Sequence, residues 1–168
     1  CSKSADSTYY TKRSCPYYDV KAMDFGIDKD TSTFKVEASA SYDDNIAFVL
    51  SIQEKERESA PGRCTVQITD AEGNQLSNVD ITETSDGFVP STCQYDASGN
   101  LYILGTLSDL SCQVYELSAG STSAKHCATV DLTGHTPTDL LILSDHFVVL
   151  TYVGVRVFST DWKLERSS

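Results

Sequence analysis

The sequence has no long hydrophobic run. Apolar segments such as Phe147 to Leu150 are far shorter than the roughly 20 residues that a membrane-spanning helix needs. The chain has 168 residues, of which 40% are hydrophobic and 10% aromatic, which is ordinary for a folded domain. The sequence therefore predicts one globular domain with a real core and no transmembrane segment in this chain.

Positive charge is also scarce. The chain carries 13 Lys and Arg residues against 24 Asp and Glu residues, which gives a net charge of -11. Such a surface repels phosphate groups, so nucleic acid and anionic membranes are excluded as partners. Cations or basic protein surfaces fit better, although an acidic surface also simply keeps a protein soluble.

Motifs for catalysis and for cofactors are absent. The sequence contains no G-x-S-x-G, no C-x-x-C and no N-x-S/T glycosylation site. The spacing of the three histidines, His126, His135 and His146, matches no metal-ligand motif. Acidic residues are too numerous to single out the two carboxylates of a glycosidase. We therefore expect no catalytic residue and no cofactor, with a glycan-acting hydrolase as the alternative.

Cysteines are few, even in number and scattered. The six cysteines stand at positions 1, 15, 64, 93, 112 and 127, mostly at the edges of strand-like runs. This distribution predicts three disulfides and hence a secreted or cell-surface protein. The alternative is a cytosolic chain with free, buried thiols. Because the first residue is Cys and not Met, we expect a processed or partial chain, or a lipid-carrying Cys1.

One pairing follows from a predicted hairpin. Cys112 and Cys127 flank a turn near Ala119-Gly120, and antiparallel pairing about that turn places the two cysteines nearly opposite each other. This predicts a Cys112–Cys127 disulfide. The four other cysteines allow three pairings. Among these we favour Cys1 with Cys15, and Cys64 with Cys93.

Hydrophobic alternation predicts β-strands along most of the chain. Residues 1–32 form a polar arm that ends in a short strand from Val20 to Ile27, and residues 33–168 form a β domain. No segment shows a helical period. The strand-like runs in the first two thirds of that domain are Phe34 to Ala38, Ile46 to Ile52, Cys64 to Ile68, Asn78 to Thr82, Leu101 to Leu107, Cys112 to Leu117 and His126 to Leu132.

The strands fall into repeats of about 50 residues. Cys64-x-Val66 matches Cys112-x-Val114, and Asn78 to Thr82 matches Thr129 to Thr133. A third copy begins near Asp139 and carries valine at the position of Cys112. The copies span about 33–83, 84–134 and 135–168.

Three copies with roughly four strands each resemble the blades of a β-propeller. The motif S-G-N-L-Y-I-L, residues 98–104, is similar to the entry of the inner strand in extracellular propellers. Cysteines within blades resemble the disulfide-bearing, sema-type kinds. Because a closed propeller has at least about four blades, the resemblance implies a partial or assembled propeller. The alternative is an all-β sandwich.

Loop residues supply the candidate binding groups. Asp43, Asp44 and Asp96 stand in turns and offer oxygen ligands for calcium, although aspartate is also an ordinary turn residue. Tyr42, Tyr95 and Tyr152 are aromatic candidates for a carbohydrate site.

The sequence as a whole favours a non-enzymatic, secreted or cell-surface interaction module that is part of a larger protein or assembly. An open set of blades exposes strand edges, so a protein partner or self-assembly is expected. The alternative is a carbohydrate-binding or glycoside-acting extracellular protein. A secreted effector or toxin subunit is a further reading that no residue distinguishes.

Overall fold

The computed structural model describes residues 24–57, 62–81 and 87–168. Within these residues the chain forms twelve β-strands and one turn of 3-10 helix, η1 (Lys55–Arg57). The strands are β1 (Ser32–Tyr42), β2 (Asn45–Glu54), β3 (Arg63–Thr69), β4 (Gln75–Ile81), β5 (Val89–Tyr95), β6 (Leu101–Thr106), β7 (Cys112–Leu117), β8 (Lys125–Val130), β9 (Asp139–Ile142), β10 (His146–Thr151), β11 (Gly154–Ser159) and β12 (Leu164–Ser167). No helix in the described part of the chain is long and apolar enough to cross a membrane.

The strands form three four-stranded sheets. The first sheet has the order β1-β2-β3-β4, the second β5-β6-β7-β8 and the third β9-β10-β11-β12, and all neighbouring pairs are antiparallel. Each sheet is thus a simple meander of strands consecutive in the sequence. The predicted all-β fold with three blade-like repeats is confirmed, and the two-sheet sandwich is not formed.

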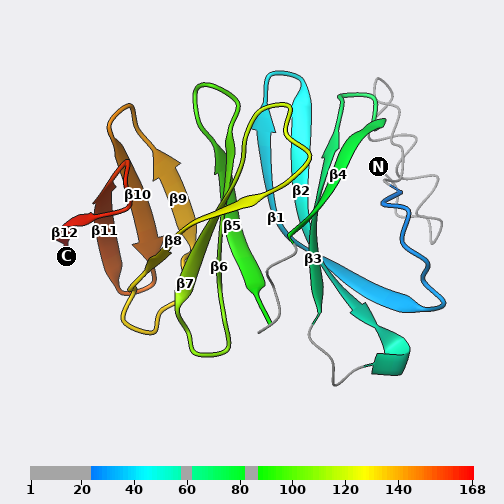
Figure 1. Ribbon diagram of the computed structural model, residues 1–168, viewed down its shortest axis with the longest axis horizontal. Helices are drawn as coiled ribbons and strands as arrows, with labels where there is room; N and C mark the ends of the chain where they lie inside the picture. Colours follow the sequence, from blue (N-terminus) through cyan, green and yellow to red (C-terminus); the bar gives the residue numbers. More distant parts are fainter. Residues whose placement is uncertain (1–23, 58–61, 82–86) are drawn as a thin grey trace, which may run out of the picture.

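The three sheets pack face to face in a row (Figure 1). One apolar cluster joins the first and second sheets and includes Val49, Val66 and Ile103. A second cluster joins the second and third sheets and includes Leu104 and Phe147. The second sheet is buried on both faces, because it packs against the first sheet on one side and the third sheet on the other. Successive residues of a strand point to opposite faces, so nearly all of its residues face a core. This explains the nearly continuous apolar runs of β6 and β7.

The first strands of the sheets lie next to one another. β1 contacts β5, and β5 contacts β9. β4, β8 and β12 form the opposite edges of their sheets. This is the arrangement of propeller blades around their axis, with β1, β5 and β9 as the inner strands.

The outer face of the first sheet is covered by the segment that precedes β1. The Phe25 ring packs edge-on against Phe34 and Phe48, with ring centroids 5.6 and 5.3 Å away. The Gln67 side-chain amide donates a hydrogen bond of 2.6 Å to the Phe25 carbonyl. The predicted strand from Val20 to Ile27 is wrong for residues 24–27, which have no regular structure. Its first part lies outside the described residues.

The predicted register of the Cys112–Cys127 hairpin is also wrong. Cys112 lies opposite Val130, and a bulge between Val114 and Tyr115 leaves Cys127 without a direct partner on β7. The Cys127 thiol instead donates a hydrogen bond of 3.6 Å to the Glu116 carboxylate. A cross-strand disulfide requires closely opposed residues, so this pairing is not formed.

The other cysteines of the described chain are free as well. Cys64 and Cys93 are buried in the same apolar cluster between the first and second sheets, without a bond between them. Burial raises the pKa of each of these thiols to about 12. The predicted Cys1–Cys15 pair lies outside the described residues.

Candidate functional site

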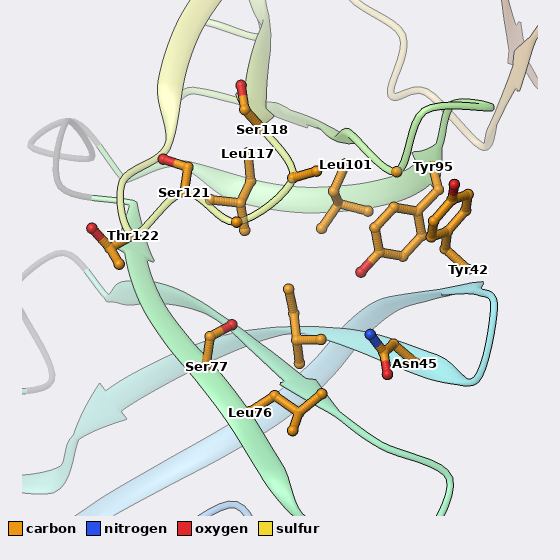
Figure 2. A pocket seen from close by; sticks show the side chains of 14 residues that line it. Tyr42, Asn45, Leu76, Ser77, Tyr95, Leu101, Leu117, Ser118, Ser121 and Thr122 are labelled. Carbon is orange, nitrogen blue, oxygen red and sulfur yellow. The ribbon is translucent and has the colours of Figure 1, made fainter.

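A groove of about 420 Å³ opens between the first and second sheets. The turns β1–β2 and β3–β4 of the first sheet and β5–β6 and β7–β8 of the second meet there, because these turns share one end of the strands. Figure 2 shows the two walls facing each other across the groove. The lining residues are Tyr42, Asn45, Ile68, Leu76, Ser77, Tyr95, Gly99, Leu101, Leu117, Ser118, Ala119, Gly120, Ser121 and Thr122.

Two tyrosines close one end of the groove. The rings of Tyr42 and Tyr95 lie 5.5 Å apart at an angle of 34° (Figure 2). The Tyr42 hydroxyl donates a hydrogen bond of 3.2 Å to the Ala97 carbonyl across the sheet boundary. The Tyr42 ring also lies against Gly99, where an added Cβ would come within 2.9 Å of the ring. Contacts with the second sheet therefore hold the Tyr42 ring in place.

Aspartate side chains shape two of the turns at this end of the strands. In the β5–β6 turn, Asp96 accepts hydrogen bonds of 2.9 Å from the backbone amides of Ser98 and Asn100, and one of 3.0 Å from the Asn100 side chain. The β3–β4 turn has the same D-A-x-G-N pattern, and Asp70 bonds Asn74 in the same way. Both aspartates thus act as turn-forming residues.

The β7–β8 loop is tied to the neighbouring β5–β6 turn. The Asn100 side-chain oxygen accepts a hydrogen bond of 3.0 Å from the Ala119 amide. Within the loop, the Ser121 amide donates a hydrogen bond of 2.9 Å to the Ser118 carbonyl. Asp96 therefore orients Asn100, and Asn100 in turn positions the loop wall of the groove.

The groove is uncharged. None of the described residues that line it is acidic or basic, and its polar groups are hydroxyls, the Asn45 amide and backbone groups. Its apolar groups are Ile68, Leu101, Leu117 and Leu76, the last with 55% of its surface exposed. Burial raises the pKa of Tyr95, so its hydroxyl stays protonated at neutral pH. Among the described residues that line the groove there is no acid–base pair.

The structure brings together two of the three predicted tyrosines. Tyr42 and Tyr95 line the groove, whereas Tyr152 is 93% exposed in the β10–β11 turn. That turn corresponds to the β2–β3 and β6–β7 connections, at the opposite end of the strands. Tyr152 therefore cannot share a site with the other two.

The predicted calcium ligands do not converge. Asp43 and Asp44 are exposed in the β1–β2 turn, and the Asp96 carboxylate already accepts three hydrogen bonds within its own turn. Among residues 24–57, 62–81 and 87–168, no group of three or more His, Cys, Asp or Glu side chains could hold a metal ion.

The histidines lie apart from the groove and from one another. His126 shares a contact of 2.7 Å with the Gln113 side-chain oxygen. His146 lies between two carboxylates, Asp145 at 2.9 Å and Glu165 at 2.7 Å. These contacts give both histidines structural partners within their own sheets.

A smaller pocket, between the second and third sheets, is polar. Its lining includes Tyr102, Glu116, Cys127 and Trp162. Burial, together with the Glu116 carboxylate, raises the pKa of Tyr102 to about 12, and burial raises that of Cys127 to about 11. Both shifts disfavour the ionised, nucleophilic form of these groups.

Sequence reasoning missed several residues of the groove. Leu76 and Ser77 precede the predicted strand from Asn78 to Thr82, and Ser121 and Thr122 belong to a Ser- and Gly-rich turn. One available signal was the repeated D-A-x-G-N motif, which marks turns at the same end of the strands. Which turns face each other across two sheets depends on sheet packing and has no local signature.

The fold and site thus define a set of propeller-type blades with a binding groove between two of them. No family model matches the chain, and no curated protein matches it. It is similar in structure to the Pyrococcus horikoshii acylaminoacyl peptidase, with a TM-score of 0.54 and 9% identity over 81% of this chain and 25% of that chain.

Two further solved structures show weaker similarity. The β-propeller domain of the Trilobed protease from Pyrococcus furiosus has a TM-score of 0.48 and 8% identity, over 82% of this chain and 43% of that one. The WD40 domain of SCAP from fission yeast has a TM-score of 0.42 and 15% identity, over 84% and 35%. The chain thus spans less than half the length of each of these three proteins.

Proposed function

We propose that the chain is a non-enzymatic interaction module that binds an extended segment of a partner protein in the groove between the first and second sheets. The uncharged lining, which combines the exposed Leu76 and the half-buried Ile68 with hydroxyl and backbone hydrogen-bonding groups, carries this proposal. Such a lining matches a peptide, which presents alternating apolar side chains and backbone amides. A groove of about 420 Å³ holds a few side chains of such a segment.

A peptide fits the groove better than a carbohydrate does. Sugar rings stack on open aromatic faces, but the Tyr42 ring lies against Tyr95 and Gly99. The groove offers only one side-chain amide, Asn45, and no charged group among its described residues to hold the hydroxyls of a sugar in a fixed geometry. A carbohydrate ligand is therefore the alternative, and the binding experiment below distinguishes it from a peptide.

Secretion is proposed on the even number of cysteines alone. The four cysteines of the described chain are free, so this proposal depends on whether cysteines form disulfides in the protein from its natural source. Peptide mapping under non-reducing conditions, on protein from its natural source, tests it. A protein in which all six cysteines are alkylated without reduction would contradict secretion through a disulfide-forming compartment.

A peptide-library selection tests the binding function. A displayed library of random twelve-residue peptides is selected on the intact protein, and the affinity of enriched peptides is measured by fluorescence polarisation. Leu76→Ser removes an exposed apolar group from the groove, and we expect it to weaken binding about tenfold. Leu143→Ser is the matched control, because Leu143 is 54% exposed and lies in the β9–β10 turn, away from the groove. Its affinity should equal that of the wild type.

Two outcomes contradict the proposal. Enriched peptides that bind Leu76→Ser as tightly as the wild type would place the site elsewhere. A glycan array in which one saccharide binds, and loses binding on Leu76→Ser, while no peptide is enriched, would favour the carbohydrate alternative.

A further inference from the structure

The third sheet leaves one apolar face without a partner in the described structure. Phe147, Val149 and Phe158 point toward the second sheet, so the alternating residues of β10 and β11 point away from it. Val148 pairs with Val157, and Leu150 pairs with Val155, across the centre of that outer face. These four side chains are half-buried and belong to neither apolar cluster.

The edge strand β9 extends this apolar surface. Leu141 lies opposite Val148 and is 44% exposed. In Figure 1 the third sheet stands at one end of the row, with no described element beyond it. We call the surface formed by Leu141, Val148, Leu150, Val155 and Val157 the outer apolar face.

The molecule itself shows how such a face is covered. On the second sheet, the face toward the third sheet carries Leu104, Val114 and Val130, all buried by sheet-on-sheet packing. The outer apolar face continues the same row of sheets with the same kind of side chains. A further sheet is therefore the cover that fits it by shape and chemistry.

We propose that the outer apolar face binds the same face of a second copy of this chain, related by a two-fold axis. A head-to-tail contact would use the outer face of the first sheet, where Phe25 already packs against Phe34 and Phe48 and so occupies part of that face. A two-fold contact needs a self-complementary surface. The aliphatic centre meets this need, and the Glu165 carboxylate on the same side of the sheet is already paired with His146, 2.7 Å away.

Charges at the two edges of the face support this pairing. Asp139 pairs with Leu150 on the β9 edge, and Arg166 pairs with Val157 on the β12 edge, so both belong to the outer side. A two-fold axis parallel to the strands lays β9 of one copy over β12 of the other. The two charges are then offset by about two residues, or about 7 Å, along the strands, which an arginine side chain spans.

The area of the outer apolar face sets the expected affinity of the dimer. Four strands about 4.8 Å apart and about five residues long cover roughly 19 Å by 17 Å. This is roughly 320 Å² from each copy, or about 650 Å² in total, which is below the standard size of specific interfaces, so we expect a weak dimer with a Kd of about 10–100 µM.

Sedimentation velocity across this concentration range tests the dimer. The wild type should shift from monomer to dimer, and Val148→Glu should weaken association at least about tenfold by placing like charges face to face. Leu76→Ser, in the groove, should dimerise like the wild type. If circular dichroism shows that Val148→Glu is unfolded, Leu141→Glu serves instead, because Leu141 is on an edge strand and 44% exposed. A wild type that stays monomeric up to about 500 µM overturns the proposal.

A charge exchange tests the two-fold geometry. Asp139→Arg and Arg166→Asp should each weaken the dimer, because each change places like charges together. The double variant Asp139→Arg/Arg166→Asp should restore it to within about threefold of the wild type. A double variant as weak as the sum of the single ones would overturn the proposed axis, and a dimer unchanged by any of these variants would place the contact elsewhere.

Discussion

Single aspartates determine the turns at the groove end of the strands. Asp96 accepts hydrogen bonds from Ser98 and Asn100, and Asn100 in turn holds the β7–β8 loop. We expect Asp96→Ala to lower the free energy of unfolding by about 1–2 kcal/mol, because these donors lose their acceptor. Urea unfolding measures the change. Asp44→Ala, at an exposed turn position, is the control and should change stability by less than about 0.5 kcal/mol.

His146 is held between two carboxylates on the third sheet. Its hydrogen bond to Asp145, and then that to Glu165, raises the pKa of its imidazole above 6.5. Because the folded pKa is raised, the stabilising effect is complete below the unfolded pKa and is lost as pH rises through the folded pKa. An NMR titration should place His146 above 6.5, and Glu165→Gln should lower its pKa. A wild-type value at or below 6.5 would contradict the two carboxylate contacts.

The four described cysteines differ in accessibility. Cys127 is half-buried and its pKa is about 11, whereas Cys64, Cys93 and Cys112 are buried with pKa values of about 12. We expect brief treatment of the native protein with iodoacetamide at pH 8 to label Cys127 first among these four. Peptide mass mapping identifies the labelled thiol, and labelling after unfolding provides the reference. Recovery of a Cys112–Cys127 linked peptide before reduction would contradict the observed register.

At the scale of strands and turns, glycine is needed at two positions for different reasons. At Gly105 on β6, an added Cβ would come within 2.3 Å of the Val89 carbonyl oxygen and 2.7 Å of the Phe88 ring. At Gly120, with φ of +75°, nothing lies within 4 Å of an added Cβ. Gly105→Ala should therefore cost about 2–4 kcal/mol through a clash with backbone, and Gly120→Ala about 1 kcal/mol through backbone strain alone. Thermal and urea unfolding compare the two, and equal losses would contradict the close packing at Gly105.

The strands could be predicted from the sequence because alternation is a local signal. The predicted runs Ile46 to Ile52, Leu101 to Leu107 and Cys112 to Leu117 correspond closely to β2, β6 and β7. The β7–β8 register could not be predicted, because it depends on the bulge between Val114 and Tyr115. A bulge shifts every later pair by one residue, and nothing in the alternation marks it.

The candidate site could be predicted only in part. Tyr42 and Tyr95 were aromatic candidates for a carbohydrate site, and they do meet in the groove. Leu76 and Ser121 face the same groove from other turns, and their proximity follows from how two sheets pack. Predicting such a site needs the order and stacking of the sheets, which the sequence pattern alone leaves open.

At the scale of the whole molecule, the three sheets differ in which of their faces are covered. The second sheet is buried on both faces, the first is covered on its outer side by Phe25, and the third leaves its outer apolar face bare among the described residues. The groove lies at the end of the first boundary, where the turns of two sheets converge. The proposed peptide binding and the proposed dimer therefore use separate surfaces and can be tested independently.

The central claim is that the groove between the first and second sheets binds a peptide. Amide chemical-shift mapping with a selected peptide tests it most directly. The account predicts that the largest shifts fall on Asn45, Ser77, Ser121 and their neighbours in the groove, and that Leu76→Ser requires about tenfold more peptide to produce the same shifts. Shifts confined to the third sheet, or an unchanged spectrum at saturating peptide, would contradict it.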